Sequence, residues 1–190
     1  MTAGIARTFE VPDPDAMHEF GIELGRTLAA GDLVLLTGPL GAGKTTLTRG
    51  IGEGLGVRGP VQSPTFVLAR THPSLVGGAP LVHVDAYRLS GADELDDLDL
   101  DFEGSVVVAE WGAGVVDTLD SWLEIVIERR AGGAAESVGT GAEEGADEDA
   151  DEDWSEAPVE ARRVTVTGYG PRWSGGVPEW LSGRSGGESE

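Results

Sequence analysis

A glycine-rich segment between two apolar stretches constrains this sequence more than any other feature. Residues 38–45, GPLGAGKT, fit the pattern G-x-x-x-x-G-K-[ST]. They follow a nearly continuous apolar run at 32–38, which is typical of a strand buried on both faces. They lead into a segment in which Leu47, Ile51 and Leu55 recur at helical spacing. The sequence therefore predicts a strand, a tight loop and a helix in immediate succession.

This succession is suited to binding the phosphates of a nucleotide. Glycines allow successive backbone N–H groups to point at one anion, and the start of the helix presents the positive end of its dipole. Lys44 adds a full charge at the β and γ phosphates, and the Thr45 hydroxyl is a hard oxygen ligand for Mg²⁺. The pattern reads no base, so it leaves ATP and GTP open. The nucleotide-binding residues expected here are Gly38, Pro39, Leu40, Gly41, Ala42, Gly43, Lys44, Thr45 and Thr46.

Two acidic residues stand at the ends of apolar runs, Asp85 after LVHV and Glu110 after VVVA. Ligands of open α/β sheets bind beyond the carboxyl ends of the strands, so both acids are expected beside the glycine-rich loop. Either carboxylate could bind Mg²⁺ or orient a water molecule that attacks the γ-phosphate. The sequence does not show which acid has which role. The candidate catalytic residues are Lys44, Asp85 and Glu110, and the candidate metal ligands are Thr45, Asp85 and Glu110. His83 shares a strand face with Asp85, which favours a hydrogen-bonding or packing role over that of a base.

The pattern along the whole chain predicts an α/β domain. Strands are expected at 7–11, 32–38, within 61–71, and at 81–85, 105–111, 122–130 and 161–170. Helices are expected from Asp13 or Asp15 to about Ala30, over 43–56, and as a short acidic helix at 92–102. Together these elements predict a P-loop NTPase fold, with a mostly parallel sheet, helices on both faces and an antiparallel edge.

The charge of the chain is strongly acidic, with 13 basic and 34 acidic residues and a net charge of −21. No basic stripe is present, so direct binding of nucleic acid is not expected. Eleven of the acids and no Lys or Arg fall within 131–160, which we expect to be a disordered, solvated loop inside a single domain of residues 1–173. Residues 174–190 are expected to form a flexible tail.

The sequence contains no cysteine, which excludes disulfides and fits a reducing compartment. No secretory signal is expected from the first residues, and no apolar run approaches the roughly 20 residues of a membrane span. We therefore expect a cytoplasmic protein with no membrane association.

Four blocks in order resemble the bacterial TsaE (YjeE) family: LTGPLGAGKTTLTRG at 36–50, SPTF at 63–66, HVDAYRL at 83–89 and EW at 110–111. The resemblance implies a small, slow ATPase that uses ATP and Mg²⁺. It also implies work with the proteins TsaB and TsaD, which carry out threonylcarbamoyl transfer to adenosine next to the anticodon of tRNA. Through that family, tRNA would be a partner only indirectly.

The same resemblance implies roles for further residues. It places the SPTF block, with Thr65, in a switch-like loop near the γ-phosphate, and Trp111 near the nucleotide. It places Glu110 close to the metal and Asp85 in a second acidic motif. The sequence departs from the family pattern at Pro39, where an acid is frequent, and at Gly112 after the Glu-Trp pair. The loss of a charge at Pro39 leaves the backbone cradle intact.

Two other functions are compatible with the phosphate-binding loop. A small-molecule kinase would need a lid rich in arginine, and no such segment is present. A non-catalytic module would bind nucleotide and metal through the same residues without turnover.

Overall fold

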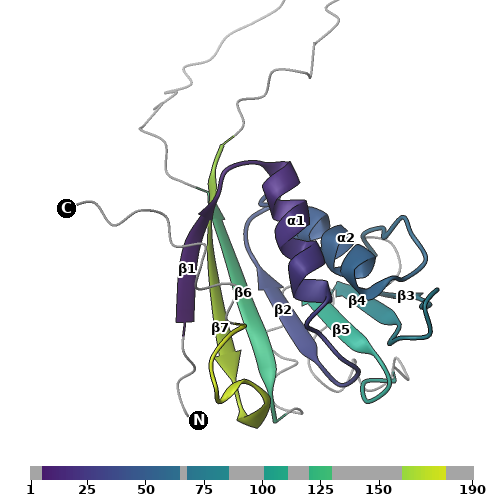
Figure 1. Cartoon of the computed structure of the whole chain (residues 1–190). Coiled ribbons are helices and arrows are strands. Elements are labelled where there is room, and N and C mark those ends of the chain that lie inside the picture. Colours follow the sequence, from purple (N-terminus) through teal and green to yellow (C-terminus); the bar gives the residue numbers. More distant parts are fainter. Residues whose placement is uncertain (1–5, 65–67, 86–100, 111–119, 130–159, 179–190) are drawn as a thin grey trace, which may run out of the picture.

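The computed structural model describes residues 6–64, 68–85, 101–110, 120–129 and 160–178. In this part of the chain one seven-stranded sheet carries two α-helices side by side on one face (Figure 1). The strands follow the order β1-β7-β6-β2-β5-β4-β3 across the sheet. Their bounds are β1 Ala6–Val11, β2 Leu33–Thr37, β3 Ala69–His72, β4 Leu81–Asp85, β5 Val106–Glu110, β6 Trp122–Arg129 and β7 Arg162–Tyr169. The helices are α1 Pro14–Gly25 and α2 Lys44–Leu55, and a 3-10 turn covers Pro171–Trp173.

The centre of the sheet is parallel, as the sequence predicted. Strand β2 runs parallel to β5 and β6, and β4 runs parallel to β5. All of β5 is buried, as are the first four residues of β2 and of β4. The apolar runs therefore mark strands buried on both faces, because a parallel strand in the middle of a sheet is covered above and below.

Both edges of the sheet are antiparallel, whereas the sequence analysis expected one. On one side β7 pairs antiparallel with β6 and with β1. On the other side β3 pairs antiparallel with β4. The second antiparallel edge has a local cause: the connection over 73–80 is too short for the crossover of a dozen or more residues that a parallel pair needs.

Helix α1 begins as expected but ends earlier. Asp13 is its N-cap, with the carboxylate accepting a hydrogen bond from the Ala16 N–H at 2.7 Å. The helix was expected to reach about Ala30, but it ends at Gly25. Beyond it the Asp32 carboxylate accepts from the Ala29 N–H, and the Asp32 N–H donates to the Ala29 carbonyl. These two bonds close a turn, which replaces the last part of the expected helix.

Four glycines let α1 and α2 pack with their backbones in contact. Gly21 faces Gly50, and Gly25 faces Gly54. A Cβ placed on Gly50 would overlap the His18 carbonyl and lie 2.9 Å from the Gly21 Cα. The spacing of four residues on each helix places these glycines along one stripe. The close contact fixes how α2 sits on the sheet, and therefore where its first turn lies.

The core lies mainly between the helix pair and the sheet. It contains Phe20 and Leu24 of α1, Leu47 and Ile51 of α2, and inward residues of the strands such as Ile125. A second apolar cluster covers the other face of β2, β4 and β5. The described helices form only one of the two expected layers, and the expected helix at 92–102 falls almost entirely outside the described residues.

The chain after β7 also contributes to the core. Trp173 and Val177 are buried in the main cluster, so packed structure extends beyond residue 173, where the tail was expected to begin. The expected acidic loop at 131–160 lies outside the described residues except for Glu160.

Candidate functional site

The glycine-rich loop, residues 38–43, connects the end of β2 to the start of α2. Gly43 is the N-cap of α2, with a φ of 107°, a conformation that glycine adopts without strain. The helix start has no side-chain cap and no acidic residue in its first turn. Helix α1 differs, because it is capped by Asp13 and carries Asp15 in its first turn. The positive end of α2 is therefore not neutralised by its own first turn, and it is suited to an external anion.

Lys44 is folded into the loop that precedes it. Its side chain is buried, and Nζ donates to the carbonyl oxygens of Gly38 at 2.8 Å and Pro39 at 3.2 Å. Nζ also lies 3.9 Å from Oε2 of Glu110. These contacts hold the ammonium group at the mouth of the loop, between the loop and β5.

The two acids of the sequence prediction lie on adjacent strands. Asp85 and Glu110 are register partners of the parallel pair β4–β5. Val108 and Glu110 alternate with residues of the opposite face, so both acids point to the face that carries the helices. Glu110 is buried and Asp85 is half-buried. The structure thus brings Lys44, Asp85 and Glu110 to the same end of the sheet.

His83 contacts Glu110 of the neighbouring strand, which fits the hydrogen-bonding role that the sequence favoured. Its Nε2 lies 2.9 Å from Oε1 of Glu110, and its side chain is fully buried. The sequence analysis left open whether His83 makes a hydrogen bond or only packs. The diagonal contact to Glu110 depends on the register of β4 against β5, which the sequence does not show.

Arg129 is a neighbour of the loop that sequence reasoning missed. Its Nη2 donates to the Leu40 carbonyl at 3.1 Å, from the last residue of β6. Gly38 packs against Ile127 of the same strand, and a Cβ on Gly38 would overlap the Ile127 carbonyl. Only the pairing of β6 with β2 brings this arginine to the loop.

The side chain of Leu40, at the tip of the loop, is 92% exposed.

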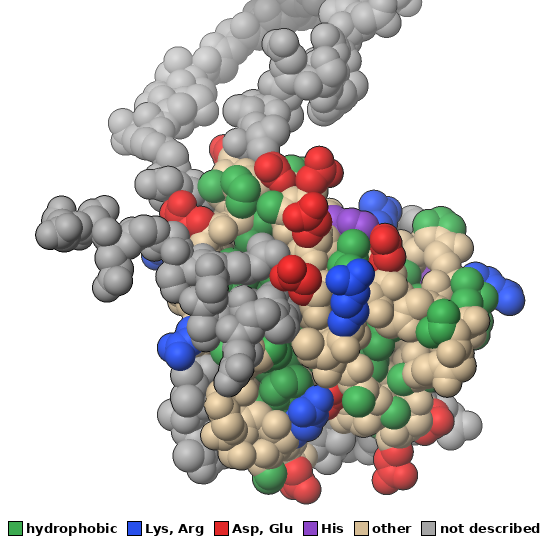
Figure 2. All heavy atoms as spheres, in the orientation of Figure 1, with side chains coloured by type: hydrophobic (Ala, Val, Ile, Leu, Met, Phe, Trp, Pro, Cys, Tyr) green, Lys and Arg blue, Asp and Glu red, His purple; other side chains and the backbone are tan. Residues whose placement is uncertain are grey.

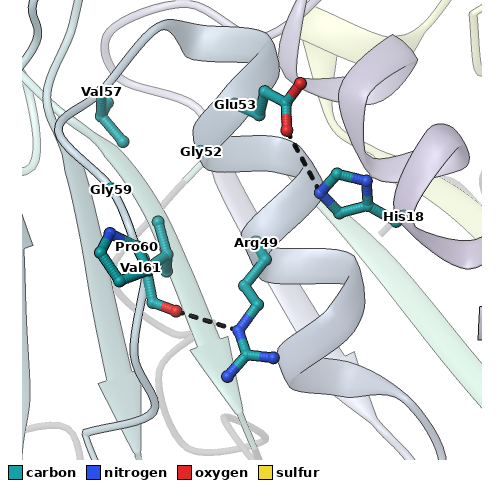
Figure 3. Close-up of a pocket in the computed structure, with 8 residues that line it drawn as sticks. All are labelled: His18, Arg49, Gly52, Glu53, Val57, Gly59, Pro60 and Val61. Carbon is teal, nitrogen blue, oxygen red and sulfur yellow. Dashed lines mark hydrogen bonds and ion pairs between the residues drawn. The ribbon is translucent and has the colours of Figure 1, made fainter. Parts of the chain in front are cut away.

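A hollow of about 280 Å³ lies between α2 and the segment 57–61 (Figure 3). Arg49 Nε donates to the Val61 carbonyl at 3.2 Å, and the Val61 side chain packs into the notch left by Gly52. His18 of α1 pairs with Glu53 at 3.4 Å on the rim. Arg49 follows Thr45 by one helical turn, so this bond ties the segment leading to Ser63 to the helix that begins at the loop.

The remaining predicted site residues have different outcomes. Thr45 and Thr46 are half-buried in the first turn of α2, beside Lys44. Ser63 is half-buried and Pro64 is buried. Thr65 and Trp111, together with Phe66, Tyr87 and Arg88, lie outside the described residues.

The residues present fit a Mg²⁺ ion that is shared with a nucleotide. Within the described residues no group of three or more histidine or acidic side chains converges to form a complete metal site. Mg²⁺ in phosphate-binding sites is typically held by one or two carboxylates together with phosphate oxygens and water. The residues that could contribute to such a partial set are Thr45 in the first turn of α2 and the adjacent acids Asp85 and Glu110.

Acidic side chains also dominate the surface near this end of the molecule. Figure 2 shows a group of acidic side chains over the region where α1 begins. The first turns of α1 carry the exposed acids Asp15 and Glu19. This surface repels the phosphate backbone of a nucleic acid.

Comparison with known proteins places this arrangement in a family. Residues 11–136 match the family model described as "Threonylcarbamoyl adenosine biosynthesis protein TsaE". The chain belongs to the TsaE family. It is 54% identical to the TsaE protein of Streptomyces coelicolor over 162 residues, which cover 83% of this chain and 94% of that protein. It is 48% identical to TsaE of Mycobacterium tuberculosis over 132 residues, or 64% of this chain and 79% of that one.

Structural comparison finds a solved structure with a similar fold. The crystal structure of Bacillus subtilis YdiB superposes with a TM-score of 0.61 at 27% identity, covering 96% of this chain and 95% of that chain. The TsaE family match spans the glycine-rich loop, both acids and all of β6. None of the helices in the described ranges is both long and apolar enough to cross a membrane.

Proposed function

We propose that this TsaE family member is a Mg²⁺-dependent ATPase with a P-loop. In this proposal it serves threonylcarbamoyl modification of the adenosine next to the anticodon in tRNA. ATP hydrolysis would drive or reset a complex of TsaB and TsaD in the cytoplasm. The family membership supports the pathway, and the geometry of the loop supports the nucleotide chemistry.

One observation carries the nucleotide part of the proposal. The start of α2 has no side-chain cap and no acid, while Lys44 is held at the loop mouth within 3.9 Å of a buried carboxylate. The start of α1, by contrast, is capped by Asp13. A strand-end acid facing a buried lysine next to such a helix start matches what a phosphate and its metal need.

The binding roles follow from the positions of the residues. The loop amides and Lys44 would bind the β and γ phosphates. Residues Gly38 to Thr46, together with Thr65, would line the nucleotide site, and Trp111 would lie near the nucleotide base. The Thr45 hydroxyl and the Glu110 carboxylate would hold Mg²⁺, which supplies charge neutralisation at the phosphates. Glu110 is assigned to the metal side because its Oε2 faces Lys44.

The hydrolysis step is an in-line attack of water on the γ-phosphate. Asp85, next to Glu110 and half-buried, orients this water. Lys44 and the loop amides stabilise the charge that spreads over the γ-phosphate oxygens. We expect slow turnover in the isolated chain and faster turnover in a complex, where a partner would supply a further group that stabilises this charge.

The charge of the chain supports an indirect relation to tRNA. With a net charge of −21 and acids gathered near the site, the chain repels a polyanion. Contact with tRNA would therefore pass through the basic surfaces of partner proteins.

The test is ATP hydrolysis by the full chain, measured alone, with TsaB and TsaD, and with both proteins and tRNA. We expect slow Mg²⁺-dependent hydrolysis by the chain alone and a clear increase when both partners are present. Nucleotide binding without hydrolysis in every combination would favour a non-catalytic module, and phosphate transfer to a metabolite would favour a kinase.

A further inference from the structure

His83 is a buried polar side chain whose role the proposed function does not use. It lies in the middle of β4, where its register partner is Val108 of β5. Its ring has no exposed surface, and Nε2 lies 2.9 Å from Oε1 of Glu110. A buried imidazole in an otherwise apolar strand costs free energy unless it is hydrogen-bonded, so the contact to Glu110 is the reason that this position is compatible with folding.

The contact selects one form of the ring. A carboxylate offers only acceptors, so Nε2 must carry the hydrogen that is donated to Oε1. Among the described residues Nδ1 has no hydrogen-bond partner. The bond between Nε2 and Glu110 is therefore the hydrogen bond that satisfies this buried ring among the described residues.

In this geometry the two carboxylate oxygens of Glu110 have different partners. Oε1 is occupied by His83, and Oε2 faces Lys44 Nζ at 3.9 Å. The side chain of Glu110 can rotate about several bonds, and the donated hydrogen bond removes that freedom. Groups that donate to a metal-binding carboxylate fix its orientation in this way, and their loss typically lowers metal affinity by about 10- to 100-fold.

The same geometry argues against His83 as a general base. A base needs its free nitrogen within reach of the water or hydroxyl that it deprotonates. Here Nε2 is engaged by Glu110, and the whole ring is shielded from solvent.

We propose that His83 is a positioning residue, which orients Glu110 so that Oε2 points toward the phosphate and metal side of the site. This proposal rests on the proposed function for the identity of the ligands. It adds a residue that touches neither nucleotide nor metal.

The test uses two substitutions that differ in where they place an amide nitrogen. His83→Gln puts its Nε2 near the position of the imidazole Nε2 and retains the donor to Glu110. His83→Asn puts its nitrogen near the Nδ1 position and loses that donor. The matched control is His18→Asn, at a half-exposed histidine on α1 that pairs with Glu53. Thermal unfolding without ligand shows whether each variant is folded.

The first measurement is the Mg²⁺ concentration at which binding of a nonhydrolysable ATP analogue to the chain reaches half its maximum. The second is the affinity for the same analogue without Mg²⁺. For His83→Asn we expect the required Mg²⁺ to rise by about tenfold or more, while metal-free binding stays unchanged. His83→Gln and His18→Asn should stay within about threefold of the unaltered chain. Equal Mg²⁺ dependence in His83→Asn and the unaltered chain would overturn the proposal, as would equal losses in the Gln and Asn variants.

A second readout needs no ligand. The nitrogen NMR signals of the His83 ring in the free chain should show a hydrogen on Nε2, and Glu110→Ala should shift them. A hydrogen on Nδ1 instead would contradict the positioning role.

If the unaltered chain binds no nucleotide at all, the proposed function fails and this proposal fails with it. If the unaltered chain shows Mg²⁺-dependent binding and the His83 variants match it, only the positioning role fails.

Discussion

At the scale of single residues, Lys44 shows how the fold prepares a side chain for a ligand. Its ammonium group is buried and donates to two loop carbonyls, next to Glu110. These contacts hold the charge in place, which would reduce the entropy lost on binding of the proposed phosphate. The identity of this residue was evident from the sequence motif, but the carbonyls and the carboxylate around it were not.

Lys44→Ala should weaken ATP binding by at least tenfold and leave the chain folded. Hydrogen bonds to charged groups contribute roughly 1.5–3 kcal/mol, which corresponds to about 10- to 100-fold in affinity. Titration of an ATP analogue, with circular dichroism as the check on folding, measures both. Arg26→Ala is the control, because Arg26 is an exposed cation at the end of α1. Unchanged affinity in a folded Lys44→Ala variant would remove the loop from the site.

Glu110→Ala should reduce turnover more than it reduces stability. The substitution removes the proposed metal ligand. The buried Lys44 keeps its two bonds to the loop carbonyls, whereas the buried His83 loses its hydrogen bond, at a cost of about 1–3 kcal/mol. The measurement is ATP hydrolysis with TsaB and TsaD present, beside the free energy of unfolding in urea. Hydrolysis at the normal rate by this variant would exclude Glu110 from the site.

His72 should make the chain less stable as the pH falls below about 6.5. Burial lowers the pKa of His72, and the charge of neighbouring His83 lowers it further, while a hydrogen bond to the Arg58 backbone opposes the shift and Arg70 adds to it. Below the ordinary histidine pKa of about 6.5 the unfolded chain binds a proton that the folded chain resists. Stability is thus fully present above that value and falls as the pH decreases toward the lower, folded-state pKa.

The comparison is urea unfolding at about pH 7.5 and pH 5.5, for the unaltered chain and for His72→Gln. The variant should lose less stability between the two values. Thr71→Gln, at the exposed neighbouring position of β3, should keep the full loss. A loss in His72→Gln equal to that of the unaltered chain would contradict the prediction.

At the scale of elements, the glycine contact between α1 and α2 fixes the position of the proposed phosphate site. The helix that carries Lys44 is held against α1 by Gly50 and Gly54, which meet Gly21 and Gly25. Glycine in a helix is less favourable than alanine by about 1 kcal/mol in free energy. These residues therefore destabilise each helix taken alone. The tertiary contact compensates, because larger residues would separate the two backbones.

Gly50→Ala should lower the free energy of unfolding by roughly 1–3 kcal/mol, although alanine favours a helix. The added Cβ meets backbone atoms of His18 and Gly21, which cannot rotate away as a side chain would. Gly175→Ala is the matched control, because a Cβ there meets open space. Urea unfolding of both variants is the measurement, and a Gly50→Ala chain as stable as the control would show that the helices separate without cost.

At the scale of the whole molecule, the sheet collects residues that are distant in the sequence at one end. Strand β2 lies between β5 and β6, so the loop after β2 is flanked by Glu110 on one side and by Arg129 on the other. The strands β6 and β7 pair along their full length, from Trp122 opposite Tyr169 to Arg129 opposite Arg162. The acidic segment between them is therefore not needed to align the two strands.

Deletion of residues 134–157 should leave ATP binding intact and the chain folded. The register of β6 with β7 is fixed by the pairs between them and by buried residues such as Ile125 and Val166. A shorter connection also costs less loop-closure entropy. Affinity for an ATP analogue should be measured in the deletion variant and the full chain at two salt concentrations, since removing acids reduces repulsion of the phosphates. Loss of binding by a folded deletion variant would refute this prediction.

The sequence by itself determined the order of the described elements, the glycine-rich loop between β2 and α2 and the two strand-end acids. It could do so because glycine, lysine and threonine at fixed spacing, and apolar runs ending in a carboxylate, are local signals. The tertiary structure alone decided that His83 meets Glu110 and that Arg129 reaches Leu40. These features depend on strand order and register, which arise from packing between segments that are far apart in the chain.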